Sequence, residues 1–292
     1  MSTTLVICRL LHFAATMLLF GAGAFLWALV PAELARAVIG PVRRMIAVAI
    51  VVAAITALAR IGLEAGQMGD GWIDGVNPGV LADVLLDTAF GRVWQWRLGL
   101  ALVLVGALAF RRHDRWAFVV PVSALLLASL GLTGHAIMQS GVVGALHRLN
   151  HALHLLAAGA WLGGLLPFIL CLGQFDDPQL RSAVGVTLRR FSGVGHFVVA
   201  LVVLTGVLNT ALTLGAWPID LSSPYQTMLA IKIAIVAAMI AMALFNSYVL
   251  APRMTNETGL ALQALKIDSV AEVALGATVL ALVSVFGILA PV

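Results

Sequence analysis

Four of the seven histidines lie in one short stretch of the chain: His135, His147, His151 and His154. At about 100° per residue, the last three fall within roughly 60° of one another on a helix and form one polar stripe. His135 and Met138 end the apolar run that precedes this stripe. Grouped imidazoles are typical ligands of metal ions. The stretch therefore predicts a ligand cluster.

The first apolar run adds an imidazole and a thiol at a similar depth, because His12 lies one helical turn after Cys8. Imidazole with sulfur suits copper, where sulfur favours Cu(I) and nitrogen tolerates Cu(II). Zinc would require a closed tetrahedral set, and the carboxylates that often complete one are not in place. The predicted metal ligands are His12, His135, His151 and His154, with Cys8, Met138 and His147 as further candidates. Either His147 or His151 can serve as the fourth ligand.

The same histidines suit a second chemistry, because two of them on facing helices can ligate a b-type haem from both sides. The sequence does not separate copper from haem. A third interpretation treats the histidines as structural groups of a membrane sensor or scaffold, with no ligand at all.

The composition predicts an integral membrane protein. The 292 residues are 62% apolar and only 10% charged, whereas soluble domains are nearer half apolar and a quarter charged. Apolar runs of about 20 residues, enough to cross a bilayer, recur along the whole chain. The fold class is all-α, a single bundle over 1–292 with about eight spans. We expect these spans at about 5–30, 44–66, 91–110, 117–138, 149–173, 191–214, 225–250 and 267–290.

Charge in the connecting loops predicts the orientation. The loops after the first, third, fifth and seventh spans carry most of the Lys and Arg residues, which places them in the cytoplasm. The loop at 67–90 is acidic and faces outward, and both termini then lie outside. This loop is the longest, and a short interfacial helix is expected near Val80–Leu86.

Several polar side chains fall inside the expected spans, where charged groups normally face the bundle interior. Arg60 and Glu64 are four residues apart and can pair along one helix face. A buried polar network is predicted from Arg60, Glu64, Lys232, Tyr225 and Asn246. Gly159, Gly163 and Gly164 predict close helix packing, and no convincing internal repeat is visible.

Other function classes find no support. The basic balance of 17 Lys+Arg against 13 Asp+Glu is explained by the cytoplasmic loops, so no nucleic-acid partner is expected. No nucleophile with a base, phosphate-binding loop or paired-carboxylate site occurs, so we do not expect an enzyme. The two cysteines are far apart and offer no disulfide framework.

Several sequence blocks, taken together and in order, resemble the CopD/PcoD family of bacterial inner-membrane copper resistance proteins. The blocks are LLDTAFGRVWQWRLGLAL (Leu85–Leu102), LTGHA (Leu132–Ala136), HLLAAGAWLGGLLPF (His154–Phe168), LRRFSGVGHFVVALVVLTGVLNT (Leu188–Thr210) and SPYQTMLAIKIAIVAAMIAMALFNSYVLAP (Ser223–Pro252). Gln226 departs from the glycine expected after the tyrosine of the last block.

The resemblance implies an eight-span inner-membrane protein of copper homeostasis that passes copper from the periplasm towards the cytoplasm. It also implies a separate periplasmic partner, a copper-binding protein of the CopC type. The positions that match the family's functional residues are His12, His135, His154, Tyr225, Lys232 and Asn246.

Overall fold

A computed structural model describes residues 1–109, 115–134, 139–215, 220–254 and 258–290, and these residues contain helices and turns but no strand. The α-helices are α1 (Ser2–Ala28), α2 (Ala32–Met68), α3 (Pro78–Asp87), α4 (Ala89–Ala109), α5 (Arg115–Ser129), α6 (Gly141–Leu172), α7 (Arg181–Leu214), α8 (Pro224–Phe245), α9 (Ala251–Arg253) and α10 (Thr258–Phe286). Two 3₁₀ turns, η1 (Asp74–Val76) and η2 (Leu130–Leu132), and a π-helical turn, η4 (Asn246–Leu250), complete the described elements. The predicted all-α class is confirmed.

Seven described helices are long and apolar enough to cross a membrane. The expected span at 117–138 is instead a shorter apolar helix over Ala117–Leu132. It is short because the chain tightens into η2, and Gly134 then adopts a φ of +79°. A left-handed φ of this kind suits glycine and ends the helix. The last four residues of the expected span lie outside the described residues.

The long helices extend beyond the apolar runs that predicted them. α2 begins at Ala32 rather than 44, α6 at Gly141 rather than 149, and α7 at Arg181 rather than 191. Hydropathy marks only the segment that lipid can cover, whereas helical hydrogen bonding continues through charged residues at its end. The expected short helix is present as α3, which Asn77 caps by accepting a hydrogen bond from the Gly79 amide at 2.9 Å, and its interfacial location stays a prediction.

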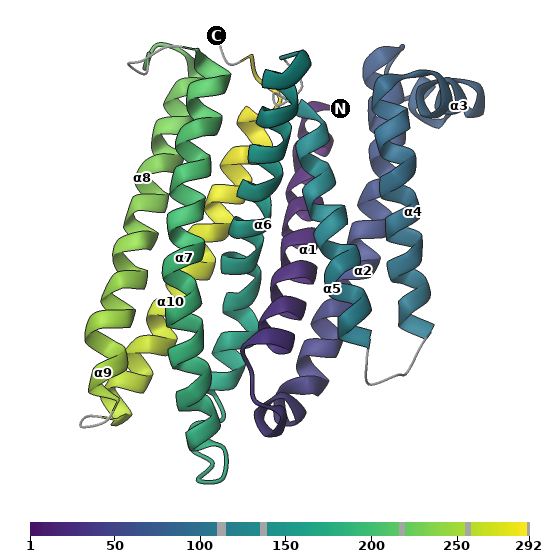
Figure 1. The fold of residues 1–292 in the computed structure, drawn as a ribbon. Coiled ribbons are helices and arrows are strands. Elements are labelled where there is room, and N and C mark those ends of the chain that lie inside the picture. Colours follow the sequence, from purple (N-terminus) through teal and green to yellow (C-terminus); the bar gives the residue numbers. More distant parts are fainter. Residues whose placement is uncertain (110–114, 135–138, 216–219, 255–257, 291–292) are drawn as a thin grey trace.

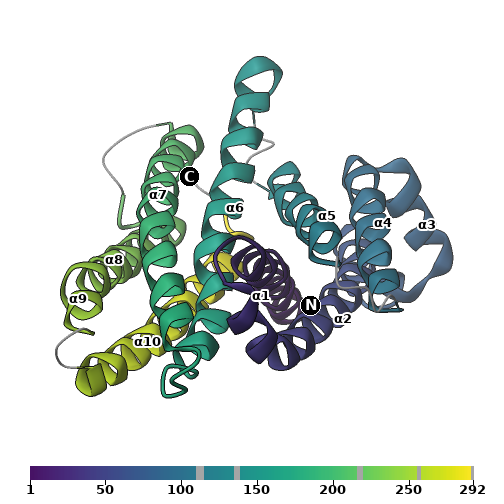
Figure 2. The ribbon, with the colours of Figure 1, turned by 60° about the horizontal axis from the view of Figure 1, so that its bottom comes forward.

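α1 and α6 form the centre of the bundle (Figure 2). α2, α3 and α4 lie on the α1 side, and α7, α8 and α9 lie on the α6 side. α5 packs on both central helices, and so does α10. The start of α1 and the end of α10 lie at the same end of the bundle (Figure 1). We refer to this as the outer end, following the predicted orientation.

The two central helices meet through backbone at Gly21 and Gly163. A Cβ atom built on Gly21 would lie 2.6 Å from the Cα of Gly163, and one built on Gly163 would lie 2.9 Å from the Cα of Gly21. Real Cβ atoms do not approach other atoms so closely, so both positions require glycine. This contact confirms the close helix packing predicted from Gly163.

Candidate functional site

A cavity of about 840 Å³ opens at the outer end of the bundle. Its walls come from the beginnings of α1, α4, α6 and α8 and from the ends of α2, α7 and α10. Because helices that alternate in direction present these ends on one side, the chain gathers residues far apart in sequence around a single space. His12, His147, His151 and His154 all line it.

His12 on α1 is held in one tautomer by Thr56 on α2. The His12 Nδ1 and Thr56 Oγ1 atoms are 2.8 Å apart, while the Thr56 hydroxyl donates to the Val52 carbonyl at 2.7 Å. A hydroxyl has only one proton, so Thr56 accepts and Nδ1 carries the ring proton. The Nε2 atom is left as a lone-pair donor. It is buried without a hydrogen-bond partner, and His12 is only 6% exposed.

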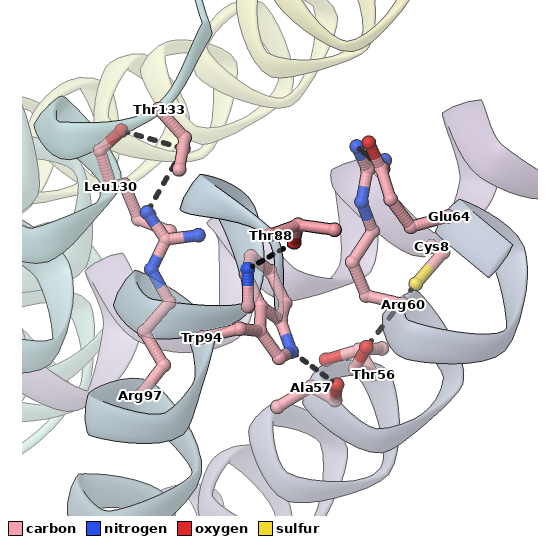
Figure 3. A network of polar contacts seen from close by, with 11 residues as sticks. Cys8, Thr56, Ala57, Arg60, Glu64, Thr88, Trp94, Arg97, Leu130 and Thr133 are labelled. Carbon is pink, nitrogen blue, oxygen red and sulfur yellow. Dashed lines mark hydrogen bonds and ion pairs between the residues drawn. The ribbon is translucent and has the colours of Figure 1, made fainter. Parts of the chain in front are cut away.

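Cys8 and Trp94 lie beside His12, and Figure 3 shows both with their hydrogen-bond acceptors on α2. The Cys8 thiol donates to the Thr56 carbonyl at 3.4 Å, one helical turn from His12. The Trp94 ring lies 6.1 Å from the imidazole, centre to centre, and its indole N–H donates to the Ala57 carbonyl at 2.7 Å. The predicted pairing of Cys8 with His12 on one helix face is therefore present.

His154 on α6 is held in the same way by Thr205 on α7. Its Nδ1 lies 2.9 Å from the Thr205 hydroxyl oxygen, and that hydroxyl donates to the Leu201 carbonyl. His154 Nδ1 therefore also carries the proton, and Nε2 is the available donor atom. Asn150, one turn earlier, donates to the Thr205 carbonyl and to the Asn209 side chain, each at 2.9 Å.

The other two described histidines of α6 have different surroundings. The His151 ring lies 6.5 Å from that of His154, nearly parallel to it. Two imidazoles sharing one ion have centres at most about 6.3 Å apart, since metal–nitrogen bonds are about 2.0–2.1 Å. The separation of 6.5 Å is slightly beyond this limit, so His151 and His154 do not share an ion in the arrangement seen here. His147 donates from Nδ1 to the Gln139 side-chain oxygen at 2.7 Å and is 1% exposed.

The structure divides the predicted ligands into two sets on opposite sides of the central helix pair. Cys8 and His12 face α2 and α4, whereas His154 faces α7. Within the described residues, no group of three or more His, Cys, Asp or Glu side chains is placed to hold one metal ion. His135 and Met138 lie outside the described residues, so their predicted role as ligands stays a prediction.

The cavity wall is strongly basic. Among the described residues that line it, the only carboxylate is Glu64, which faces five basic residues: Arg9, Arg60, Arg97, Arg148 and Lys232. The predicted Arg60–Glu64 pair is confirmed, with an N–O distance of 2.8 Å (Figure 3). One further nitrogen of Arg60 and the Nε of Arg9 are buried without a hydrogen-bond partner. The wall thus keeps a net positive charge.

Arg97 is the most completely buried of these cations, at 1% exposure. It donates to the Ser129 hydroxyl at 3.1 Å, the Ser129 carbonyl at 2.6 Å and the Thr133 hydroxyl at 2.9 Å. Its guanidinium also lies 4.4 Å from the centre of the Trp94 ring, within cation–π range. Arg97 therefore ties α4 to the end of α5 and η2 (Figure 3).

The predicted polar network falls into separate parts. Tyr225 and Lys232 line the outer cavity with Arg60 and Glu64. Asn246 lies instead in η4, where its amide donates to Asp268 and to Glu272, the latter at 3.0 Å. Glu272 also accepts from the Trp161 indole at 3.1 Å, and this cluster borders a second cavity of about 370 Å³.

Sequence reasoning missed Thr56 and Thr205, and it left Arg97 out of the predicted polar network. A signal existed for the arginine, because Trp94 is three residues earlier and so lies on the same helix face. For the threonines the only hint is that a membrane-buried imidazole needs an acceptor for its ring N–H.

Fold and cavity together define a polytopic α-helical membrane protein with a histidine-lined, basic cavity at its outer end. The chain belongs to the CopD family, the copper resistance protein D family. The model "Copper resistance protein D-like, N-terminal domain" matches residues 1–145, and the model "Copper resistance protein D" matches residues 185–286.

Curated relatives extend the match over nearly the whole chain. "Inner membrane protein YebZ" of Escherichia coli is 36% identical over 99% of this chain and 98% of its own length. "Copper resistance protein D" of Pseudomonas syringae pv. tomato is 27% identical over 94% of this chain and 93% of its own. "Copper transport protein CutJ" of Bacillus subtilis is 27% identical over 57% of this chain but only 32% of its own. No solved structure matches the chain.

Proposed function

We propose that this protein binds copper in its outer cavity and passes it across the inner membrane, from the periplasm towards the cytoplasm. Membership of the copper resistance protein D family supports a role in copper handling. A relative named as a copper transport protein supports movement, and one named as an inner membrane protein supports the location. In this proposal the chain is a carrier and not an enzyme.

The observation that carries the proposal is the orientation of His12 and His154. Each imidazole donates a hydrogen bond from Nδ1 to a threonine hydroxyl and keeps a lone pair on Nε2. Metal-binding histidines commonly have the same arrangement. Both residues line the same cavity, and the Cys8 thiol lies beside one of them. Imidazole nitrogen and cysteine sulfur are suitable donors for copper.

Copper would reach the cavity from a separate periplasmic copper-binding protein of the CopC type. The cavity opens at the predicted periplasmic end, which is the side on which such a partner would release its ion. Co-purification of a periplasmic copper protein with the membrane-embedded chain, dependent on copper loading, would test this part of the proposal.

The alternative is a b-type haem that takes two of the same histidines as its axial ligands. The available ligand atoms would again be the Nε2 atoms, because Nδ1 of His12 contacts Thr56 and Nδ1 of His154 contacts Thr205. An absorption spectrum separates the two, because only the haem gives a Soret band.

The proposal is tested by metal analysis and an absorption spectrum of the purified, detergent-solubilised protein, followed by copper uptake into vesicles. We expect bound copper, no Soret band, and uptake that depends on the protein. The variant His154→Ala should bind less copper and lose uptake while remaining folded. His196→Ala is the matched control, because His196 is exposed, does not line the outer cavity and hydrogen-bonds the Ser192 carbonyl of its own helix.

Protein that binds no copper after loading would contradict the proposal and favour a scaffold. Iron with a Soret band would identify a haem protein instead. Copper binding without uptake would restrict the proposal to a copper-binding role.

A further inference from the structure

The two central helices contact each other reciprocally. A Cβ atom on Gly21 would meet the Cα of Gly163 and the carbonyl of Gly159, while one on Gly163 would meet the Cα of Gly21 and the carbonyl of Met17. The same number of residues separates Gly21 from Gly163 and Met17 from Gly159. Gly21 thus contacts the equivalent of Met17, and Met17 contacts the equivalent of Gly21. Such an exchange of partners is typical of two units related by a two-fold axis.

The same sequence offset relates the chemistry of the two helices. His12 and His154 are separated by this offset, and each donates a hydrogen bond from Nδ1 to a threonine on the following long helix. Cys8 and Asn150 are separated by the same offset, and each of these donates to the backbone carbonyl of that same threonine. The two histidine sites are thus built alike, down to the residue one turn earlier.

The remaining helices follow the same order around the two centres. α1 packs on α2, α5 and α10, whereas α6 packs on α7, α10 and α5. The third long helix of each half carries a cation on the cavity wall, Arg97 in α4 and Lys232 in α8. With four predicted crossings before α6, both halves enter the membrane from the same side, as in parallel repeats.

We infer that the chain consists of two parallel four-helix repeats and holds two separate copper positions, one in each repeat. This inference rests on the proposed copper-binding function. The first position is at the Nε2 of His12 and the second at the Nε2 of His154. Each imidazole is held against a different helix, His12 by Thr56 on α2 and His154 by Thr205 on α7, so each position has its own surroundings.

The two positions differ in the donors beside the histidine. Cys8 puts a thiol next to His12 in the first repeat, and sulfur favours Cu(I). At the equivalent place the second repeat has Asn150, whose amide is engaged with Thr205 and Asn209. His151 supplies the neighbouring donor there, so the second position offers nitrogen only.

Copper stoichiometry tests the inference directly. Purified protein is loaded with Cu(I) under a competing chelator, and bound copper is measured for the wild type, His12→Ala, His154→Ala and the double variant. We expect two, one, one and no copper ions per chain. Size-exclusion profiles and melting curves of the same samples establish that each variant is folded.

Three results would contradict the two-position inference or the proposed function. A folded single variant that loses all copper would mean one shared ion and would overturn the two-position inference. A single variant that loses none would remove its histidine from any site and would also overturn it. A wild type that binds no copper would instead refute the proposed function.

Copper X-ray absorption separates the two positions. His154→Ala retains only the first position, so its spectrum should contain a sulfur neighbour that disappears when Cys8→Ser is added. His12→Ala retains only the second, which should show nitrogen or oxygen neighbours alone. A sulfur neighbour in His12→Ala, or none in His154→Ala, would contradict the assignment of the positions.

Discussion

A threonine hydroxyl has one proton to donate. When it donates a hydrogen bond to a carbonyl of its own helix, it can only accept hydrogen bonds from other neighbours. Thr56 and Thr205 both use their proton in this way, on the carbonyls of Val52 and Leu201. An imidazole beside such a hydroxyl must donate from Nδ1, which fixes both its tautomer and its rotation. At the scale of single residues, these two threonines determine what the two histidines can bind.

Thr205→Val removes the acceptor for His154 with little change in side-chain volume. The imidazole is then free to rotate and to protonate at either nitrogen, so copper affinity should fall by about 10–100-fold at the second position. The measurement is a Cu(I) titration against a competing chelator. The control is Thr278→Val, because Thr278 is exposed and its hydroxyl donates to the Ala274 carbonyl one turn earlier in its own helix. Equal affinity in both variants would show that Thr205 does not position His154.

The sequence makes some of these residue-level features predictable and hides others. Arg60 and Glu64 pair within one helix, so their spacing alone predicts the contact. Thr56 and Thr205 contact histidines on other helices, and that depends on how far each helix is rotated and shifted. Hydropathy carries no information about rotation, so the threonines could not be identified in advance.

At the scale of elements, the contact between α1 and α6 holds the two halves together. These helices approach through glycine backbone, and the dense packing that results replaces a hydrophobic driving force that is absent within lipid. α5 and α10 then pack across both central helices.

Gly163→Ala should destabilise the bundle, because its new methyl group would collide with α1 backbone at Met17 and Gly21. Overpacking of this kind typically costs about 1–3 kcal/mol, which lowers the melting temperature by several degrees. Gly99→Ala is the matched control, since Gly99 lies within the membrane helix α4 and has no atom within 4 Å of its added Cβ. A melting temperature unchanged in Gly163→Ala would contradict the close contact.

The order and type of the long helices follow from apolar run lengths, since lipid permits little else. α2 and α7 begin before their apolar runs because charged residues continue these helices, whereas the added turns of α6 are mostly apolar and carry only Arg148. The repeat stayed hidden because Cys8 corresponds to Asn150 and Arg97 to Lys232. Cys8 and Asn150 share a position and a contact but not a residue type, whereas Arg97 and Lys232 share only the corresponding helix and a place on the cavity wall.

At the scale of the whole molecule, the outer cavity opposes the cation it is proposed to receive. Its described lining has five basic side chains and one carboxylate, which is already paired with Arg60. Two unit charges about 10 Å apart repel by about 1.7 kcal/mol at an effective dielectric constant of about 20. The binding free energy from the imidazole and thiol donors must exceed this repulsion. A copper ion that binds together with an anion is therefore repelled less than the bare ion.

Lys232→Met removes one of these charges and keeps most of the side-chain length. It should tighten Cu(I) binding at the second position by about tenfold in buffers without coordinating anions. Chloride should reduce the difference between the variant and the wild type. Lys266→Met is the control, because Lys266 lies near the opposite end of α10 and lines neither cavity. Weaker binding in Lys232→Met would instead assign the lysine a role in holding the ligand.

The glycine crossing also has a mechanical consequence. His12 and His154 lie about 13 Å along their helices from Gly21 and Gly163, at a rise of about 1.5 Å per residue. Because no side chain separates the helices at this crossing, α1 and α6 can rotate relative to each other about it. A rocking motion of about 10° would sweep each imidazole through about 2 Å, the length of a metal–nitrogen bond. A small tilt of one repeat against the other therefore moves each imidazole far enough to release a bound ion.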